Sequence, residues 1–65
     1  MIYRVHHFNF GTIRDFPNRA DADAFVERAH FDAVIYKIED GQDAERVATF
    51  SAIRGWYDES RLWPR

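Results

Sequence analysis

The absence of cysteine from a chain of only 65 residues is the sequence feature that most restricts how this protein can fold. A domain of this length buries only about 60% of the surface that its unfolded chain exposes, and no disulfide or thiolate metal site can supplement that burial. Apolar side chains must therefore hold the fold together. The six Phe, three Tyr and two Trp can each bury about 150–250 Å². We expect one compact domain over residues 1–65 that uses most of its large apolar groups for folding.

The lack of disulfides also bears on location. Small secreted domains usually contain them, so their absence favours a reducing cytoplasm. The chain opens with MIYRVHHFNF, in which Arg4 and His6 interrupt the apolar run. This opening predicts neither a signal peptide nor a membrane span, and we expect no membrane partner.

Charge is distributed unevenly along the chain. Residues 15–45 hold nine acidic and three basic residues, a net charge of −6, between two segments that each carry +2. The whole chain has a net charge of −2. An acidic middle is poorly suited to gripping a phosphate backbone, so we do not expect direct nucleic-acid binding. It is well suited to meeting a basic protein surface.

Strand-forming residues dominate the first segment, and helix signals follow it. Residues 2–10 alternate and predict a strand, but neither of its faces is purely apolar. Residues 12–16 form either a short second strand or an extended entry to the next element. Pro17 disfavours helix at the residue before it, and Asn18 is a good N-cap. A helix over about residues 19–30 follows, with an apolar stripe at helical spacing: Ala22, Phe25, Val26 and Ala29.

The second half predicts a β-hairpin followed by an aromatic tail. Residues 33–39 alternate as a strand, Asp40-Gly41 is a turn pair, and residues 46–54 return as a strand that Gly55 ends. The last ten residues, WYDESRLWPR, show no clear periodicity, so residues 55–65 are interpreted as a C-terminal tail. The predicted fold is α+β, with one helix packed on an antiparallel sheet of three to four strands in the order β(β)αββ.

No arrangement of residues indicates catalysis. His6 and His7 are adjacent on a predicted strand, so their side chains leave on opposite faces, and His30 is alone near a helix end. Ser51 and Ser60 lack a nucleophile-elbow context, and the three glycines are isolated rather than forming a phosphate loop. We therefore expect a protein that is not an enzyme and that uses no metal or cofactor.

Two surface features are candidates for binding a partner. The first is a set of acids that either forms a solvated helix face and an ordinary polar loop or forms a docking surface: Asp21, Asp23, Glu27, Asp40, Asp43 and Glu45. The second is the tail, whose Trp56, Tyr57 and Trp63 belong to the residue types enriched in interface hot spots. The alternative is that the tail folds back over the open sheet face. We divide the two tryptophans between these uses and expect Trp56 to be structural and Trp63 to be exposed.

The layout resembles that of small phage-encoded inhibitors, particularly anti-CRISPR proteins of similar length. The likeness covers residues 2–54 and is carried by the strand YRVHHFNF, the helix NRADADAFVERA and the hairpin AVIYKIEDGQDAERVATF. It is a likeness of layout and charge, without a shared motif. It implies a non-catalytic protein that blocks a Cas protein by covering a basic nucleic-acid-binding surface.

Our leading hypothesis is therefore an inhibitor from a phage or mobile element that acts in the bacterial cytoplasm on a host protein or nucleoprotein with a basic surface. An inhibitor of host RNA polymerase fits the same layout. A different hypothesis is a small nucleic-acid-binding module that stacks bases on the open sheet face, with these candidates: Tyr3, His7, Phe8, Tyr36 and Arg54. A third is a homo-oligomer. The partner's identity and the binding face stay open at this level.

Overall fold

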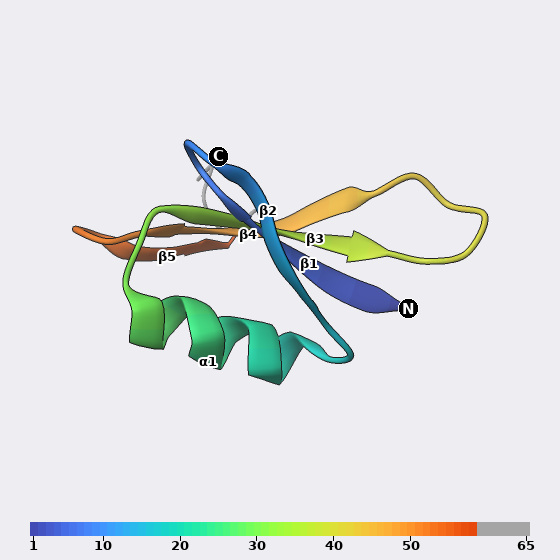
Figure 1. Cartoon of the computed structure of the whole chain (residues 1–65), viewed down its shortest axis with the longest axis horizontal. Helices are drawn as coiled ribbons and strands as arrows, with labels where there is room; N and C mark the ends of the chain where they lie inside the picture. The colour runs from blue at the N-terminus through green and yellow to red at the C-terminus, as the bar shows by residue number, and fades with distance from the viewer. Residues whose placement is uncertain (59–65) are drawn as a thin grey trace.

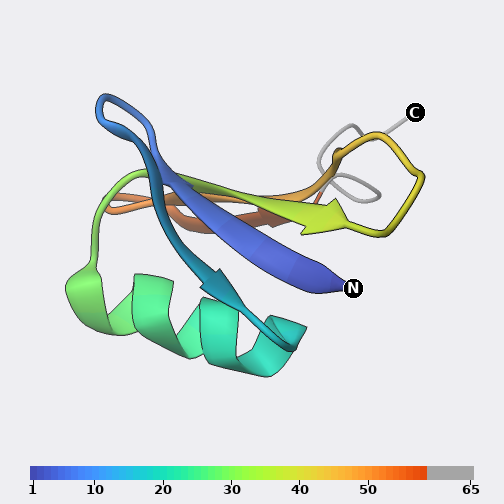
Figure 2. The same cartoon turned by 45° about the vertical axis from the view of Figure 1, so that its right-hand side comes forward.

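One helix lies against one face of a twisted antiparallel sheet in the computed structural model, which describes residues 1–58 (Figure 1). The elements in chain order are β1 (Ile2–His7), β2 (Gly11–Phe16), α1 (Arg19–Ala29), β3 (Ala33–Ile38), β4 (Glu45–Ser51) and β5 (Gly55–Asp58). The strand order across the sheet is β2-β1-β3-β4-β5, and every neighbouring pair is antiparallel. The helix carries the chain from edge strand β2 past β1 to β3 (Figure 2).

The α+β class and the single helix agree with the sequence, but the strand count does not. Residues 12–16, which the sequence left open, belong to edge strand β2. The prediction that Gly55 ends the sheet was wrong, because the chain turns there with a positive φ of 92° and returns as β5, paired with β4. A four-residue strand is too short to show alternation, so the sequence pattern did not indicate a strand in this part of the predicted tail. The described chain thus has five strands rather than three to four.

The helix begins and ends as its flanking residues dictate. Asn18 has an extended backbone, and its side-chain oxygen accepts a hydrogen bond from the Asp21 N–H at 2.9 Å, as expected of an N-cap. At the other end His30 adopts a left-handed conformation with a φ of 58°, and its N–H donates to the Val26 carbonyl at 2.7 Å. The predicted stripe was wrong at Ala29, which is exposed, because the helix ends there.

The core lies between α1 and the sheet. Val5, Ile35 and Ala48 stand opposite one another on β1, β3 and β4 and form one fully buried row. The other buried residues are Phe16, Ala22, Val26, Ala33 and Phe50. Small alanines in the row and on the helix allow α1 to approach the sheet closely, and no polar side chain is buried within residues 1–57.

The opposite face of the sheet has no helix over it. Alternation and register place one row of side chains there, in the order Thr12, His6, Val34, Thr49 and Tyr57 across the five strands. The sequence alone did not decide which face of the first strand is buried. The complete burial of Val5 assigns the odd-numbered face to the core. Within the described part of the chain, no helix is long and apolar enough to cross a membrane.

Candidate functional site

The six acids predicted to form a docking surface lie on two different elements. Three are on α1, and three are in or beside the loop between β3 and β4. This loop extends from the far end of the sheet, whereas α1 lies beneath one sheet face (Figures 1 and 2). The fold therefore divides the acidic segment of the sequence into two separate surfaces.

The helical acids are occupied by contacts within the fold. The Asp21 carboxylate accepts one hydrogen bond from the Asn18 side-chain amide at 3.2 Å, and the Asp21 N–H donates to the Asn18 side-chain oxygen at 2.9 Å. Asp23 pairs with Arg19 at 2.7 Å, one helical turn earlier. Glu27 accepts a hydrogen bond of 2.6 Å from the indole nitrogen of Trp56. These three carboxylates contact the N-cap side chain, neutralise a neighbouring arginine and join α1 to β5.

Four acids lie in or beside the β3–β4 turn, and we call Glu39, Asp40, Asp43 and Glu45 the acidic loop. Lys37 pairs with two of them, with its nitrogen 3.5 Å from Glu39 and 3.7 Å from Glu45. The charges of Glu45 and then Glu39 raise the pKa of Lys37.

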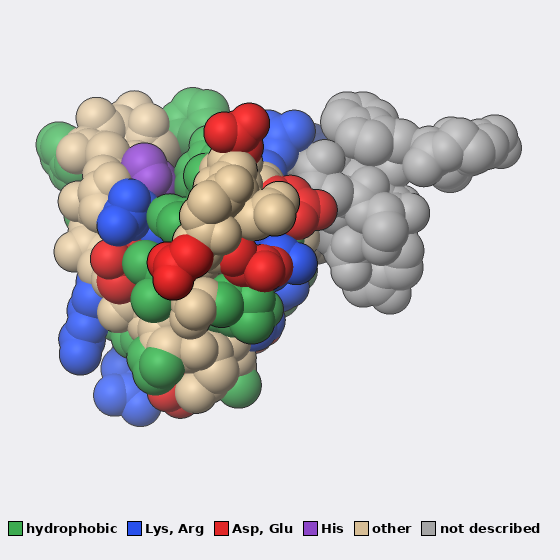
Figure 3. All heavy atoms as spheres, turned by 90° about the vertical axis from the view of Figure 1, so that its right-hand side faces the viewer, with side chains coloured by type: hydrophobic (Ala, Val, Ile, Leu, Met, Phe, Trp, Pro, Cys, Tyr) green, Lys and Arg blue, Asp and Glu red, His purple; other side chains and the backbone are tan. Residues whose placement is uncertain are grey.

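Asp40 and Asp43 are exposed and form no ion pair with any residue in the 1–58 range. Residues 37–45 together carry a net charge of −3. Figure 3 faces this end of the molecule and shows carboxylates gathered over it, with basic side chains at the sides.

The three aromatic residues predicted to anchor a partner lie in different environments. Trp56 is half-buried, and its ring centroid lies 4.9 Å from that of core residue Phe50 in an edge-to-face arrangement. Together with the bond to Glu27, this contact makes Trp56 a structural residue. Tyr57 is half-buried on the opposite sheet face, and Trp63 lies outside the described residues.

Apolar groups beside the acidic loop come instead from the start of the chain. Ile2 stands opposite Ile38 in the β1–β3 pair, which places Met1 and Ile2 next to the strand that leads into the loop. Met1 is 64% exposed, and both isoleucines are half-buried. Sequence reasoning missed this neighbourhood, although an antiparallel pairing of the first strand with residues 33–39 would have indicated it.

The open sheet face carries a small aromatic and polar group. The rings of His6 and Tyr36 meet edge to face with centroids 4.9 Å apart, and the Thr12 hydroxyl is 3.2 Å from the His6 Nε2. Beside them Arg4 forms a two-point ion pair with Asp15, at 2.7 and 3.0 Å. Of the residues proposed for base stacking, only Tyr36 lies on this face. Tyr3 and His7 share the helix side with Val5, and Phe8 and Arg54 are in turns.

Within residues 1–58, no three His, Asp or Glu side chains are close enough to hold a metal ion. Comparisons with protein-family models, curated proteins and solved structures found no match to this chain.

Proposed function

We propose that this protein is a non-enzymatic inhibitor, encoded by a phage or mobile element, that docks its acidic loop on a basic nucleic-acid-binding surface of a host protein in the bacterial cytoplasm. The observation that carries the proposal is the exposed pair Asp40 and Asp43, which have no cationic partner among the described residues and stand on a loop that extends from the sheet. Cas nucleoproteins and host RNA polymerase are the candidate partners, because both hold nucleic acid on basic surfaces.

Charge and apolar contact have separate roles in this interaction. Complementary charge accelerates encounter and sets specificity more than it sets affinity, and it weakens with salt because the Debye length is only about 8 Å at physiological ionic strength. Residual affinity at high salt must come from apolar contact. Met1 and the Ile2–Ile38 pair are the apolar groups next to the acidic loop.

The test is a comparison of three purified chains: wild type, Asp40→Lys/Asp43→Lys, and Asp40→Glu/Asp43→Glu. Each is immobilised and exposed to nuclease-treated bacterial lysate, and captured proteins are identified by mass spectrometry. We expect the wild type and the glutamate variant to retain one nucleic-acid-binding protein that added DNA or RNA displaces, and the lysine variant to lose it. Equal capture by the lysine variant, or capture that nucleic acid does not displace, would contradict the proposal.

A second candidate function rests on the His6–Tyr36 ring pair beside Arg4 on the open sheet face. Aromatic rings on an uncovered sheet can stack exposed bases, at about 1–3 kcal/mol for each base. The ion pair between Arg4 and Asp15 and the net charge of −2 oppose this function. Fluorescence anisotropy with labelled single-stranded DNA and RNA at low salt distinguishes the two functions. The inhibitor function predicts no binding to free nucleic acid. The nucleic-acid-binding function predicts binding that Tyr36→Ala weakens.

A further inference from the structure

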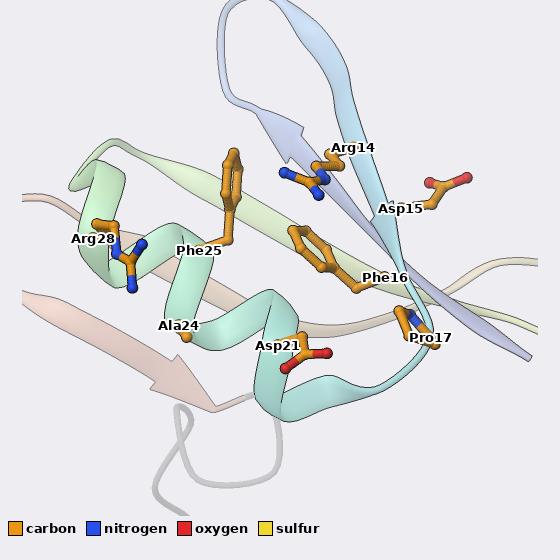
Figure 4. Close-up of a pocket in the computed structure, with 8 residues that line it drawn as sticks. All are labelled: Arg14, Asp15, Phe16, Pro17, Asp21, Ala24, Phe25 and Arg28. Carbon is orange, nitrogen blue, oxygen red and sulfur yellow. The ribbon is translucent and has the colours of Figure 1, made fainter.

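A groove runs between α1 and edge strand β2, and none of its lining residues belongs to the acidic loop (Figure 4). Its volume is about 390 Å³. The rings of Phe16 and Phe25 form its apolar part, with centroids 5.3 Å apart. Arg14 from β2 and Arg28 from α1 lie on either side of Phe25 in the close-up view. The groove therefore combines apolar rings with two guanidinium groups.

The two arginines differ from Arg4 and Arg19 because neither forms an ion pair within residues 1–58. Arg4 pairs with Asp15 and Arg19 pairs with Asp23, but neither Arg14 nor Arg28 forms an ion pair with a residue in the described part of the chain. The Arg14 guanidinium lies 5.1 Å from the Phe16 ring centroid and 5.9 Å from that of Phe25. A guanidinium whose face rests on rings keeps its in-plane N–H donors for an anion. These donors match a carboxylate in two-point geometry.

The rings behind the groove belong to a longer aromatic series that fixes its shape. Phe25 meets Phe31 edge to face at 6.2 Å, Phe31 stacks on His7 at 4.9 Å, and His7 contacts Phe10 at 4.5 Å. The Asn9 N–H also donates to the His7 Nδ1 at 3.0 Å, which holds the imidazole ring in place. A wall built in this way is formed before any ligand arrives, so binding requires little reordering of side chains.

The outer edge of β2 pairs with no strand among the described residues, because β2 stands at the end of the sheet order. Its residues 12–15 are exposed. An unpaired edge offers backbone N–H and C=O groups to an added strand, and neighbouring side-chain sites then give specificity. In this protein those sites are the rings and arginines of the groove.

We propose that this groove binds an extended acidic peptide segment of a partner protein, which adds to β2 as a strand and places a carboxylate between Arg14 and Arg28. Charge complementarity identifies the occupant, since both cations lack a partner. A peptide that brings one carboxylate fits better than a nucleic-acid strand, because Asp15 and Asp21 also line the groove and would repel a run of successive anionic groups. This surface is separate from the acidic loop, so the inference does not depend on the inhibitor function.

The experiment is a selection from a display library of random twelve-residue peptides against the immobilised wild-type chain, after which the enriched peptides are measured against Arg14→Ala/Arg28→Ala. We expect enriched peptides to contain a carboxylate beside an apolar residue. Each single arginine substitution should weaken their binding about tenfold or more, the usual scale for a charge-assisted hydrogen bond. The control is Arg54→Ala, which removes the same charge from an exposed turn and should leave the affinity unchanged.

Strand addition is tested with the best peptide N-methylated at either its odd or its even positions, because only one edge of an added strand faces β2. We expect one methylation pattern to abolish binding and the other to preserve it, with amide resonances of residues 11–16 shifting in the bound state. Lack of acidic enrichment, equal binding to the double arginine variant, equal effects of both patterns, or binding only to nucleic acid or a second copy of this chain would overturn the proposal. Asp40→Lys/Asp43→Lys should bind the peptide normally, which distinguishes failure here from failure of the acidic-loop function.

Discussion

Arg4 and Asp15 hold β1 and β2 together at the surface by a two-point ion pair of 2.7 and 3.0 Å. The hydrogen bond from Arg4 is the main reason why the pKa of the Asp15 carboxyl lies below its ordinary value. A carboxyl with a lowered pKa in the folded state adds stability above its unfolded pKa of about 3.9, and this stability is lost as the pH falls through the lower folded pKa. The pair is exposed, so its contribution is small and sensitive to salt.

We predict that Asp15→Asn reduces the loss of stability between pH 7 and pH 2 relative to wild type. Urea denaturation at the two pH values and low ionic strength, followed by circular dichroism, measures the effect. The difference between the two chains should shrink in 0.5 M salt, where surface charges are screened. An acid-induced loss of the same size in both chains would contradict the assignment.

Single residues also show where sequence reasoning reaches its limit. The N-cap role of Asn18 was predictable, because a cap acts within its own turn of helix. The partners of Glu27 were not, since Trp56 is 29 residues away and contacts it only once β5 has formed. A carboxylate in a sequence looks the same whether it faces solvent or accepts a hydrogen bond from an indole. The sequence therefore shows where the acidic residues are concentrated, but it does not show which of their carboxylates are free of partners in the fold.

At the scale of elements, β5 is attached to α1 chiefly through Trp56. The ring packs against Phe50 on β4, and the indole nitrogen donates a hydrogen bond of 2.6 Å to Glu27 on α1. The Arg19 guanidinium lies 5.9 Å from the same ring. We predict that Trp56→Phe, which keeps an aromatic ring but removes the donor, lowers the free energy of unfolding by about 1 kcal/mol.

Urea denaturation followed by circular dichroism checks the Trp56 prediction. Glu27→Gln keeps an acceptor at the same place and is the matched control, with a smaller expected loss. Glu27→Leu, which has no acceptor, should lower the free energy of unfolding about as much as Trp56→Phe does. The double variant Trp56→Phe/Glu27→Leu should lower it by little more than either single change. Additive losses in the double variant would show that the two side chains are not coupled.

The elements differ in how far pattern alone could predict them. The α1 segment carries a cap, a preceding proline and an apolar stripe, so three independent local signals agree. The β3–β4 hairpin is similarly marked by alternation around Asp40-Gly41. By contrast, β2 contains a register shift opposite Val5 and His6 that breaks its alternation. The groove between β2 and α1 was not predicted, because Arg14 and Arg28 are distant in sequence and meet only through the packing of their elements.

At the scale of the whole molecule, the two ends of the sheet differ in character. The acidic loop stands at one end. At the other, the β1–β2 and β4–β5 turns are joined by Asp32, whose carbonyl accepts from the Phe8 N–H at 3.0 Å and whose carboxylate accepts from the Ala52 N–H at 2.8 Å. These turns carry the most exposed large apolar residues: Phe8 at 70%, Phe10 at 79% and Ile53 at 92%.

Exposed apolar groups on neighbouring turns favour self-association. We predict that Phe8→Ser/Ile53→Ser leaves the free energy of unfolding within about 0.5 kcal/mol of wild type, since neither side chain is buried. The same change should reduce the mass measured by light scattering at high protein concentration. Phe10→Ser is the informative comparison, because that ring contacts His7 at 4.5 Å and its loss should lower stability as well. A double variant that unfolds readily would mean that these turns pack against more than the solvent, and that the apolar end belongs to the core rather than to the surface.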